Sequence, residues 1–382
     1  MIPFNKPYLT GKETEYIKDA VTSGKISGNG KYTALCQNFF ESRYGFKKCL
    51  LTTSCTDALE MCAILCDVNP GDEVICPSFT FVSSALAFVR QGAKIVFADS
   101  RADHPGIDET KIEELITEKT KVIVVVHYAG VSCDMDKIMD IAKKYNVWVV
   151  EDAAQAVDSF YINKNGIKKA LGSIGHLGTF SFHETKNIQC GEGGMLCVND
   201  ERFFKRAEII WEKGTNRAEF FRGEVNKYGW VDIGSSFLPS EINAAFLYAQ
   251  LENLIDIQNK RKILWNKYYE IMSNLKTNIF KLPNIPDYAT NNAHMFYLLC
   301  KDIDSRTYLI NKLKENKIHA VFHYQSLHKS VFYNSKHDGR ILNNSDNFSD
   351  CLLRLPFYYE LEIENVEKIC EIIKSLISAY GN

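Results

Sequence analysis

The sequence lacks the features that would place the protein in a membrane, on a nucleic acid or outside the cell. Among 382 residues, 45 are Lys or Arg and 47 are Asp or Glu, so no overall basic field attracts nucleic acid. The longest uncharged run, residues 74–89, contains Pro77 and four hydroxyl side chains and is too short and polar to span a bilayer. The first residues show no basic start followed by an apolar stretch. We therefore expect a cytoplasmic protein that binds neither nucleic acid nor membrane.

Paired cysteine motifs are also absent, although cysteine itself is not scarce. The twelve cysteines are scattered, no CxxC pair occurs, and Cys49, Cys62, Cys66, Cys197 and Cys300 lie inside apolar runs. A disulfide scaffold or a zinc site requires more regular spacing. We therefore predict reduced, mostly buried thiols and no metal site.

Short apolar runs alternate with helical patterns between residues 48 and 200. Near-continuous apolar runs, typical of strands buried on both faces, occupy residues 48–54, 72–77, 93–99, 121–127, 146–152, 177–183 and 194–199. Helical spacing is found in residues 55–67, 81–92, 108–118 and 134–145. This βαβ series predicts an α/β fold with a mostly parallel sheet covered by helices.

The remaining segments indicate a second, smaller domain. Thr10 and Glu13 predict a capping box for a helix that reaches about Val21. A long helical pattern over 240–275 predicts a bridge to an α+β region with strands at 295–300 and 319–324 and a helix at 305–316. We expect a large domain over 1–250 and a small domain over 251–382.

The first predicted strand is followed by Ser54-Cys55-Thr56-Asp57, which opens a helix. Ligands of open α/β sheets gather at the carboxyl ends of the strands. The free N–H groups of a helix start, with two hydroxyls beside them, suit a phosphate. The alternative interpretation is that Ser54 or Thr56 only caps the helix.

Two further strand ends carry charged residues. Glu151 and Asp152 follow four apolar residues, and a buried carboxylate requires a cationic partner, which a salt bridge or a bound organic cation could supply. Lys186 follows the strand pattern of 177–183 and precedes the glycine cluster at 191–194. Most lysines are solvated surface groups. A desolvated lysine, however, has a lowered pKa and is a nucleophile able to form a Schiff base.

A phosphate site, a buried acid and a reactive lysine match the phosphate, ring nitrogen and aldehyde of pyridoxal 5'-phosphate (PLP). The βαβ pattern also occurs in nicotinamide dehydrogenases. The turn TTSCTD at residues 52–57 contains no glycine, however, and no GxGxxG follows the first strand. The sequence therefore favours PLP over a dinucleotide.

Many ordered motifs resemble those of one enzyme family. They include LLTTSCTDALEM, GDEVICPSFTFVS, VVEDAAQ, FSFHETKN, GEGG, DIGSS, FHYQSLH and RLPFY. On these motifs the chain resembles the DegT/DnrJ/EryC1/StrS sugar aminotransferases over essentially its whole length. The resemblance implies the fold-type I, aspartate aminotransferase-like fold of PLP-dependent enzymes.

The resemblance also implies roles at matching positions. Lys186 would hold PLP covalently and move the proton, and Asp152 would face the pyridinium nitrogen. Gln155 would lie near the 3'-oxygen of the ring, while Ser54, Cys55 and Ser181 would hold the phosphate. Phe79 would cover the pyridine face, with core packing as the alternative.

Within the family, the chain is most similar to members that aminate dTDP-4-keto-6-deoxy-D-glucose with L-glutamate, giving dTDP-4-amino-4,6-dideoxy-D-galactose for enterobacterial common antigen or O-antigen. Rival interpretations are a sister enzyme that gives the gluco epimer or acts at C3, and a non-catalytic sugar-nucleotide binding protein. Family members with histidine in place of the lysine are dehydratases, so Lys186 favours transamination. Relatives form homodimers with active sites at the subunit interface. The GYN-type stretch that contacts the neighbouring subunit is Gly234-Ser235-Ser236 here.

Overall fold

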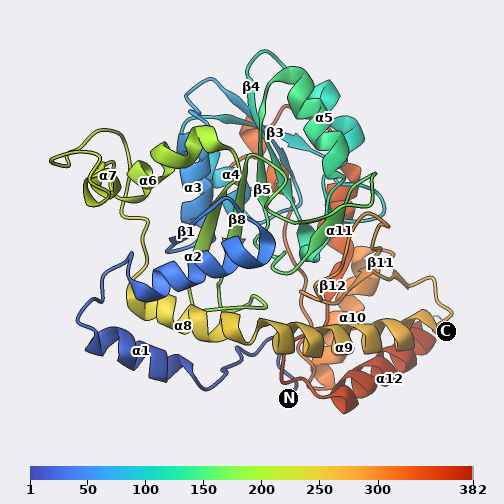
Figure 1. The fold of residues 1–382 in the computed structure, drawn as a ribbon. Coiled ribbons are helices and arrows are strands. Elements are labelled where there is room, and N and C mark those ends of the chain that lie inside the picture. The colour runs from blue at the N-terminus through green and yellow to red at the C-terminus, as the bar shows by residue number, and fades with distance from the viewer. Residues whose placement is uncertain (381–382) are drawn as a thin grey trace.

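The computed structural model describes residues 1–380 and is built around one seven-stranded sheet (Figure 1). The strand order is β1-β9-β8-β5-β4-β2-β3. The strands are β1 (Lys48–Thr52), β2 (Glu73–Pro77), β3 (Lys94–Ala98), β4 (Thr120–Val126), β5 (Trp148–Asp152), β8 (Leu177–Ser181) and β9 (Gly194–Val198). Four neighbouring pairs are parallel, and only β9 runs against its neighbours β1 and β8. The predicted α/β class with a mostly parallel sheet is confirmed.

The pairing brings several chain turns to one edge of the sheet. Because β1 and β8 are both antiparallel to β9, they point in the same direction as each other and as β5, β4 and β2. The residues that follow β1, β5 and β8 therefore meet at one edge, where a ligand site is expected. The first residue of β9, Gly194, lies at the same edge.

Helices cover both faces of the sheet and continue into the C-terminal region (Figure 1). They are α1 (Glu13–Thr22), α2 (Lys31–Tyr44), α3 (Cys55–Leu65), α4 (Ser83–Val89), α5 (Met135–Tyr145), α6 (Phe204–Trp211), α7 (Arg217–Phe221), α8 (Glu241–Glu252), α9 (Leu254–Ser273), α10 (Ile303–Glu315), α11 (Asn343–Cys351) and α12 (Ile363–Tyr380). No helix within residues 1–380 combines the length and hydrophobicity needed to cross a membrane.

The C-terminal region has its own three-stranded antiparallel sheet in the order β10-β11-β12. Its strands are β10 (Phe280–Lys281), β11 (Tyr297–Cys300) and β12 (Leu352–Arg354), and a separate hairpin joins β6 (Phe160–Ile162) to β7 (Lys168–Ala170). Residues from α9 to α12 form a hydrophobic core distinct from the two cores that flank the large sheet. On these separate cores we propose a domain division near residue 250.

Several local expectations are corrected. Residues 319–324 form no strand, since only Val321 pairs, in one bridge with Arg354. Residues 108–118 form two 3₁₀ turns, Glu109–Lys111 and Glu113–Leu115, rather than an α-helix, because the backbone is already extended again at Ile116. The long pattern from residue 240 is interrupted at Asn253, between α8 and α9.

The predicted capping box of α1 is only half formed. The Glu13 carboxylate accepts hydrogen bonds from the Thr10 and Gly11 N–H groups at 2.7 and 2.9 Å, but the helix begins after Lys12 without a side-chain cap. The Gln250 side chain of α8 also donates to Glu13, at 2.7 Å. A tertiary contact therefore holds Glu13, which is buried.

All twelve cysteines are free thiols, and all but Cys55 are buried. Their burial confirms the prediction of mostly buried side chains made from the apolar runs. Burial raises the pKa of the Cys55 thiol, so it is protonated at neutral pH.

Candidate active site

A cavity of about 670 Å³ lies where the carboxyl edge of the large sheet meets the C-terminal region. It brings together six of the seven residues predicted for the site: Ser54, Cys55, Asp152, Gln155, Ser181 and Lys186. Phe4 and Asn5 of the N-terminal segment line it too, as do residues beyond 290. Residues 300 positions apart in the chain thus share one cavity.

The start of α3 lines one end of the cavity. Ser54 caps the helix, its Oγ accepting the Asp57 N–H at 3.0 Å, so the capping interpretation holds. The N–H groups of the first helical turn have no acceptor within the helix. A Cβ on Gly194 would lie 2.3 Å from the Ser54 carbonyl oxygen and 2.4 Å from the Cys55 nitrogen. Only glycine therefore allows β9 to start against this helix end.

The two acids at the end of β5 have different surroundings. The Glu151 carboxylate points away from the cavity and accepts hydrogen bonds from His127 Nε2 at 2.8 Å and from the Gly172 and Ile174 N–H groups at 2.8 and 2.6 Å. Asp152 lines the cavity and is 5 % exposed. Its carboxylate accepts from the Ser84 hydroxyl at 2.6 Å and from the Ala154 N–H at 3.1 Å. Within residues 1–380, Glu151 has a histidine partner and Asp152 has no cationic one.

We expect Glu151→Gln to destabilise the fold without altering the cavity. The carboxamide of glutamine lacks the negative charge of Glu151, and its NH₂ group would face the N–H groups that now donate to the carboxylate. At least one of these buried donors therefore loses its acceptor. Removing one member of a buried pair costs about 3–5 kcal/mol. Guanidinium unfolding should show this loss in the free energy of unfolding. The exposed Glu201→Gln, as control, should change it by less than about 0.5 kcal/mol.

Lys186 lies in the loop between β8 and β9, and its side chain enters the cavity. The loop is held at both sides: the Lys186 N–H donates to the His183 carbonyl at 2.9 Å, and the buried Asn187 side chain donates to Gln258 at 2.8 Å. Burial lowers the pKa of the Lys186 ammonium, against the smaller opposing effects of Cys55 and Asp152. A larger fraction of this amine is therefore uncharged and nucleophilic than for an ordinary lysine.

The remaining predicted polar residues are fixed by protein contacts. The Gln155 side chain accepts from the Ala129 N–H at 2.6 Å and donates to the Tyr324 hydroxyl at 3.0 Å. Ser181 Oγ accepts from the His183 N–H at 3.3 Å, and Cys55 Sγ lies 3.6 Å from Thr179 Oγ1.

The structure corrects the position predicted for Phe79. Its side chain is 1 % exposed and packs in a small core with Tyr128 and Phe348, outside the cavity. Phe81, two residues later, lines the cavity and is 55 % exposed. The chain turns after β2, where the Thr80 N–H donates to the Ser78 carbonyl, so the strand alternation does not continue to Phe79.

Residues that the sequence did not indicate complete the cavity. His294, Tyr324 and Arg354 come from the C-terminal region and line it. Ser84, near the start of α4, is fully buried outside the lining and donates a hydrogen bond to Asp152. Arg354 lies in the motif RLPFY and Tyr324 in the motif FHYQSLH. The local pattern of apolar and polar residues does not indicate that either side chain contacts a sheet more than 100 residues away in the chain.

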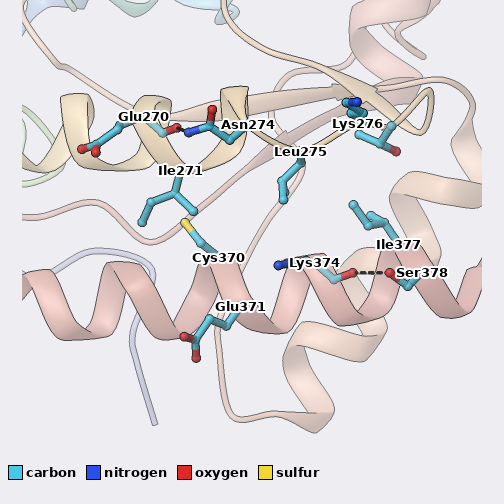
Figure 2. A pocket seen from close by; sticks show the side chains of 11 residues that line it. Glu270, Ile271, Asn274, Leu275, Lys276, Cys370, Glu371, Lys374, Ile377 and Ser378 are labelled. Atoms are coloured by element: carbon cyan, nitrogen blue, oxygen red, sulfur yellow. Dashed lines mark hydrogen bonds between the residues drawn. The ribbon is translucent and has the colours of Figure 1, made fainter.

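A second groove, of about 500 Å³, lies between α9 and α12 (Figure 2). Glu270, Lys276, Glu371 and Lys374 give it two charges of each sign. The two hydrogen bonds drawn join Asn274 and Ser378 to carbonyl groups of their own helices. None of the seven residues predicted for the site lines this groove.

The residues of the first cavity fit PLP. The start of α3 and Ser181 offer donors for a phosphate, Asp152 offers a buried carboxylate without a cation, and Lys186 offers an amine. When bound, PLP withdraws electrons from the carbon that loses its proton. The protein's part is to orient the ring and to hold the proton that moves.

Comparisons with known proteins agree with this geometry. The model of the DegT/DnrJ/EryC1/StrS aminotransferase family matches residues 7–374. The chain is 31 % identical to GDP-perosamine synthase of Escherichia coli O157:H7, over 99 % of both chains. It is 29 % identical to the spore coat polysaccharide biosynthesis protein SpsC of Bacillus subtilis (strain 168), over 98 % of this chain and 97 % of SpsC.

Two solved structures share the fold over nearly their whole length. The aminotransferase TlmJ of Streptoalloteichus hindustanus gives a TM-score of 0.90 at 25 % identity, covering 100 % of both chains. Spr1654 of Streptococcus pneumoniae, in its PLP form, gives 0.88 at 25 % identity, covering 99 % of both. The cavity, its lysine and these matches lead to one conclusion: the chain is a PLP-dependent sugar aminotransferase that belongs to the DegT/DnrJ/EryC1/StrS aminotransferase family.

Proposed function

We propose that the protein transfers the amino group of L-glutamate to C4 of dTDP-4-keto-6-deoxy-D-glucose, giving dTDP-4-amino-4,6-dideoxy-D-galactose and 2-oxoglutarate. The observation that carries the transaminase chemistry is the cavity in which Lys186 and Asp152 face the start of α3. The choice of acceptor is supported by the motifs DIGSS and RLPFY, which resemble enzymes that use this sugar. The twelve cysteines are free thiols, which supports a cytoplasmic location.

The geometry of the cavity supports the following residue roles. Lys186 holds the cofactor and then moves the proton between cofactor and substrate carbon. Asp152, kept in place by Ser84 and the Ala154 N–H, faces the ring nitrogen. Ser54, Cys55 and Ser181 bind the phosphate, and Phe81 is placed to cover the ring in the role first assigned to Phe79.

The identity of the acceptor sugar has specific alternatives. One curated relative is named for a GDP-linked sugar, perosamine, so a GDP-keto sugar is an alternative. A product with the gluco configuration and amination at C3 are others. The purified protein should be incubated with PLP, L-glutamate and a panel of dTDP- and GDP-linked 3-keto and 4-keto sugars, and the products identified by NMR. A galacto 4-amino product from the dTDP substrate supports the proposal, and preference for another acceptor contradicts it.

We also propose that the active protein is a homodimer. The segment between α6 and α8, which stands away from the body of the molecule with α7 (Figure 1), exposes several large apolar side chains. They are Phe221, Tyr228, Trp230, Val231 and Ile233, exposed by 52–84 %. A contiguous group of this kind is typical of an interaction surface.

Trp230→Ala is expected to weaken the dimer at least about 30-fold, because buried tryptophans often contribute 2 kcal/mol or more to an interface. Light scattering or sedimentation over a concentration series should show monomer for the variant at concentrations where the wild type is dimeric. Ile303→Ala, which truncates an exposed apolar side chain at the start of α10, is the control. A wild-type protein that is monomeric and active at assay concentrations would contradict the proposal.

A further inference from the structure

A buried network of side-chain amides connects the Lys186 loop to the C-terminal region. Asn187, the residue after Lys186, donates from Nδ2 to the Gln258 side chain of α9 at 2.8 Å and to the Asn292 carbonyl at 3.0 Å. Its Oδ1 lies 2.9 Å from Nδ1 of His294. Asn187, Gln258 and His294 are all buried. The network therefore fixes the imidazole of His294 against the residue that follows Lys186.

The hydrogen bonds of Asn187 decide which nitrogen of His294 carries the proton. A main-chain carbonyl only accepts, so the amide nitrogen of Asn187 must face the Asn292 carbonyl and its Oδ1 must face His294. Because an amide oxygen is also only an acceptor, Nδ1 of His294 is a protonated nitrogen that donates to it.

The ring of His294 is neutral and offers its second nitrogen to the cavity. Burial lowers the pKa of His294, and the charges of Lys186, Arg261 and Arg354 lower it further. A neutral imidazole that donates through Nδ1 accepts through Nε2. Within residues 1–380 this Nε2 has no hydrogen-bond partner, and it is not one of the enclosed polar atoms that lack a partner. Because His294 lines the cavity, the free lone pair is open to it.

The amine of Lys186 is the matching donor. It lines the same cavity, and within the part of the chain that the structure describes it has neither a hydrogen bond nor an ion pair. An ammonium carries three N–H groups and requires acceptors where water is excluded. The other charged and titratable groups that act on it are Cys55, Asp152 and Arg354. The oxygens of Asp152 already accept two hydrogen bonds, a thiol is a weak acceptor, and a guanidinium is none.

His323 is the second imidazole near Lys186, and burial together with the charges of Arg354 and Lys186 lowers its pKa. Its Nδ1 lies 2.5 Å from the Tyr128 hydroxyl, which can donate or accept. Either nitrogen of His323 can therefore carry the proton, and this contact reserves no lone pair for the cavity. Of the two imidazoles, only His294 is fixed by its neighbours as an acceptor.

Resting on the proposed role of Lys186, we propose that His294 is a positioning residue for this lysine. Its Nε2 accepts an N–H of the Lys186 ammonium in the steps where the amine is detached from the cofactor and carries the proton. Asn187 anchors the ring through Nδ1 and keeps the acceptor open to the cavity. The lysine is then held in place between taking up the proton and returning it, and no proton passes to His294.

The test compares His294→Asn and His294→Gln with the wild type, using the full chain freed of cofactor. The amide of asparagine reaches the position of Nδ1 and can still donate to Asn187, but it leaves the position of Nε2 without an acceptor. The amide of glutamine reaches the position of Nε2 and can offer its oxygen there. Trace acetylation with acetic anhydride over a pH series, followed by peptide mapping, measures the ionisation of Lys186. The exposed Lys329 is the reference in the same samples.

NMR of the protein with ¹⁵N-labelled histidine reports which ring nitrogen carries the proton. In the wild type, His294 should be protonated at Nδ1 alone. His176 provides the opposite reference, since its Nδ1 accepts the Val149 N–H at 2.9 Å and its Nε2 must therefore carry the proton of the neutral ring. The keto sugar constant of each variant is measured separately, with cofactor present.

His294→Asn is expected to move the midpoint of Lys186 acetylation down by about one pH unit, because a hydrogen bond to a charged group favours its charged form. His294→Gln should recover most of this shift, since it returns an acceptor to the position of Nε2. His176→Asn is the matched control, the same substitution outside the cavity, and should leave the midpoint unchanged. Thermal unfolding of the variants separates these results from misfolding, and the NMR experiment on the wild type needs no variant.

A His294 protonated at Nε2, or an unchanged midpoint in His294→Asn, would overturn the inference. A midpoint that moves in His294→Gln as far as in His294→Asn, or only in His294→Gln, would also overturn it and would leave the contact with Asn187 as the role of the residue. A shift caused by His323→Asn alone would assign the acceptor to His323. A keto sugar constant that rises in His294→Asn without a shift at Lys186 would assign Nε2 to a sugar hydroxyl instead.

Neither the NMR experiment nor the acetylation requires cofactor, amino donor or sugar. A protein that transferred no amino group would therefore contradict the proposed function and would still give a tautomer for His294 and a midpoint for Lys186. An active enzyme whose midpoint ignored His294→Asn would contradict only the present inference.

Discussion

Lys186→Ala is expected to reduce transamination by at least about 10⁴-fold, because the variant loses both the covalent attachment and the group that moves the proton. The start of α3, Ser181 and Asp152 remain, so the variant should still bind added pyridoxamine phosphate. Steady-state assays with glutamate and the keto sugar measure the rate, and equilibrium dialysis measures cofactor binding. Lys329→Ala is the control, since Lys329 is exposed and pairs with Asp346 outside the cavity.

Chemical labelling tests the same assignment without a mutation. Borohydride reduction of the wild type with PLP, followed by peptide mapping, should place the pyridoxyl group on Lys186. Because burial lowers the pKa of this amine, its attachment to PLP should become faster as the pH rises and should level off at a lower pH than for a solvated lysine. Label on another lysine, or near-normal turnover by Lys186→Ala, would refute the role.

Asp152→Asn is expected to lower turnover by about 10²- to 10⁴-fold while PLP still binds. The carboxamide has the same shape, accepts the Ala154 N–H and can donate to the Ser84 hydroxyl, so the local structure should persist. In the proposed role, the negative charge of Asp152 keeps the ring nitrogen protonated. The uncharged carboxamide would not do so, and the ring would then withdraw less electron density from the breaking C–H bond. Single-turnover rates with glutamate, compared with PLP affinity for the same variant, separate the two effects.

Asp158→Asn is a suitable control, because Asp158 pairs with Arg43 outside the cavity. It should leave single-turnover rates within about 2-fold of the wild type, because Asp158 does not line the cavity. If Asp152→Asn retained near-normal rates and bound PLP normally, Asp152 would be a structural hydrogen-bond acceptor for Ser84. If the variant also lost PLP, Asp152 would be needed for cofactor binding, and the rate alone would not show a role in catalysis.

The sequence by itself determined the sheet and the main chemistry of the site. Buried strands read as near-continuous apolar runs, and parallel strands end at one edge, so residues after separate strands converge without any knowledge of distances. Ser54, Asp152 and Lys186 were found in this way. The prediction failed where hydrogen bonding departed from a regular pattern, as in the 3₁₀ turns near Ile112 and the turn that buries Phe79.

Only the tertiary structure decided which of two neighbouring acids lines the cavity. Glu151 and Asp152 are adjacent and equally acidic in sequence, but strand alternation sends them to opposite sides, one to His127 and the loop amides and the other to the cavity. Arg354 reaches the site because β12 ends beside the large sheet, a contact between segments about 170 residues apart. The periodicity of apolar residues is a local property of the chain, so the sequence predicts the strands and helices. The partner of a buried charge is set by packing between distant segments, so only the folded structure identifies it.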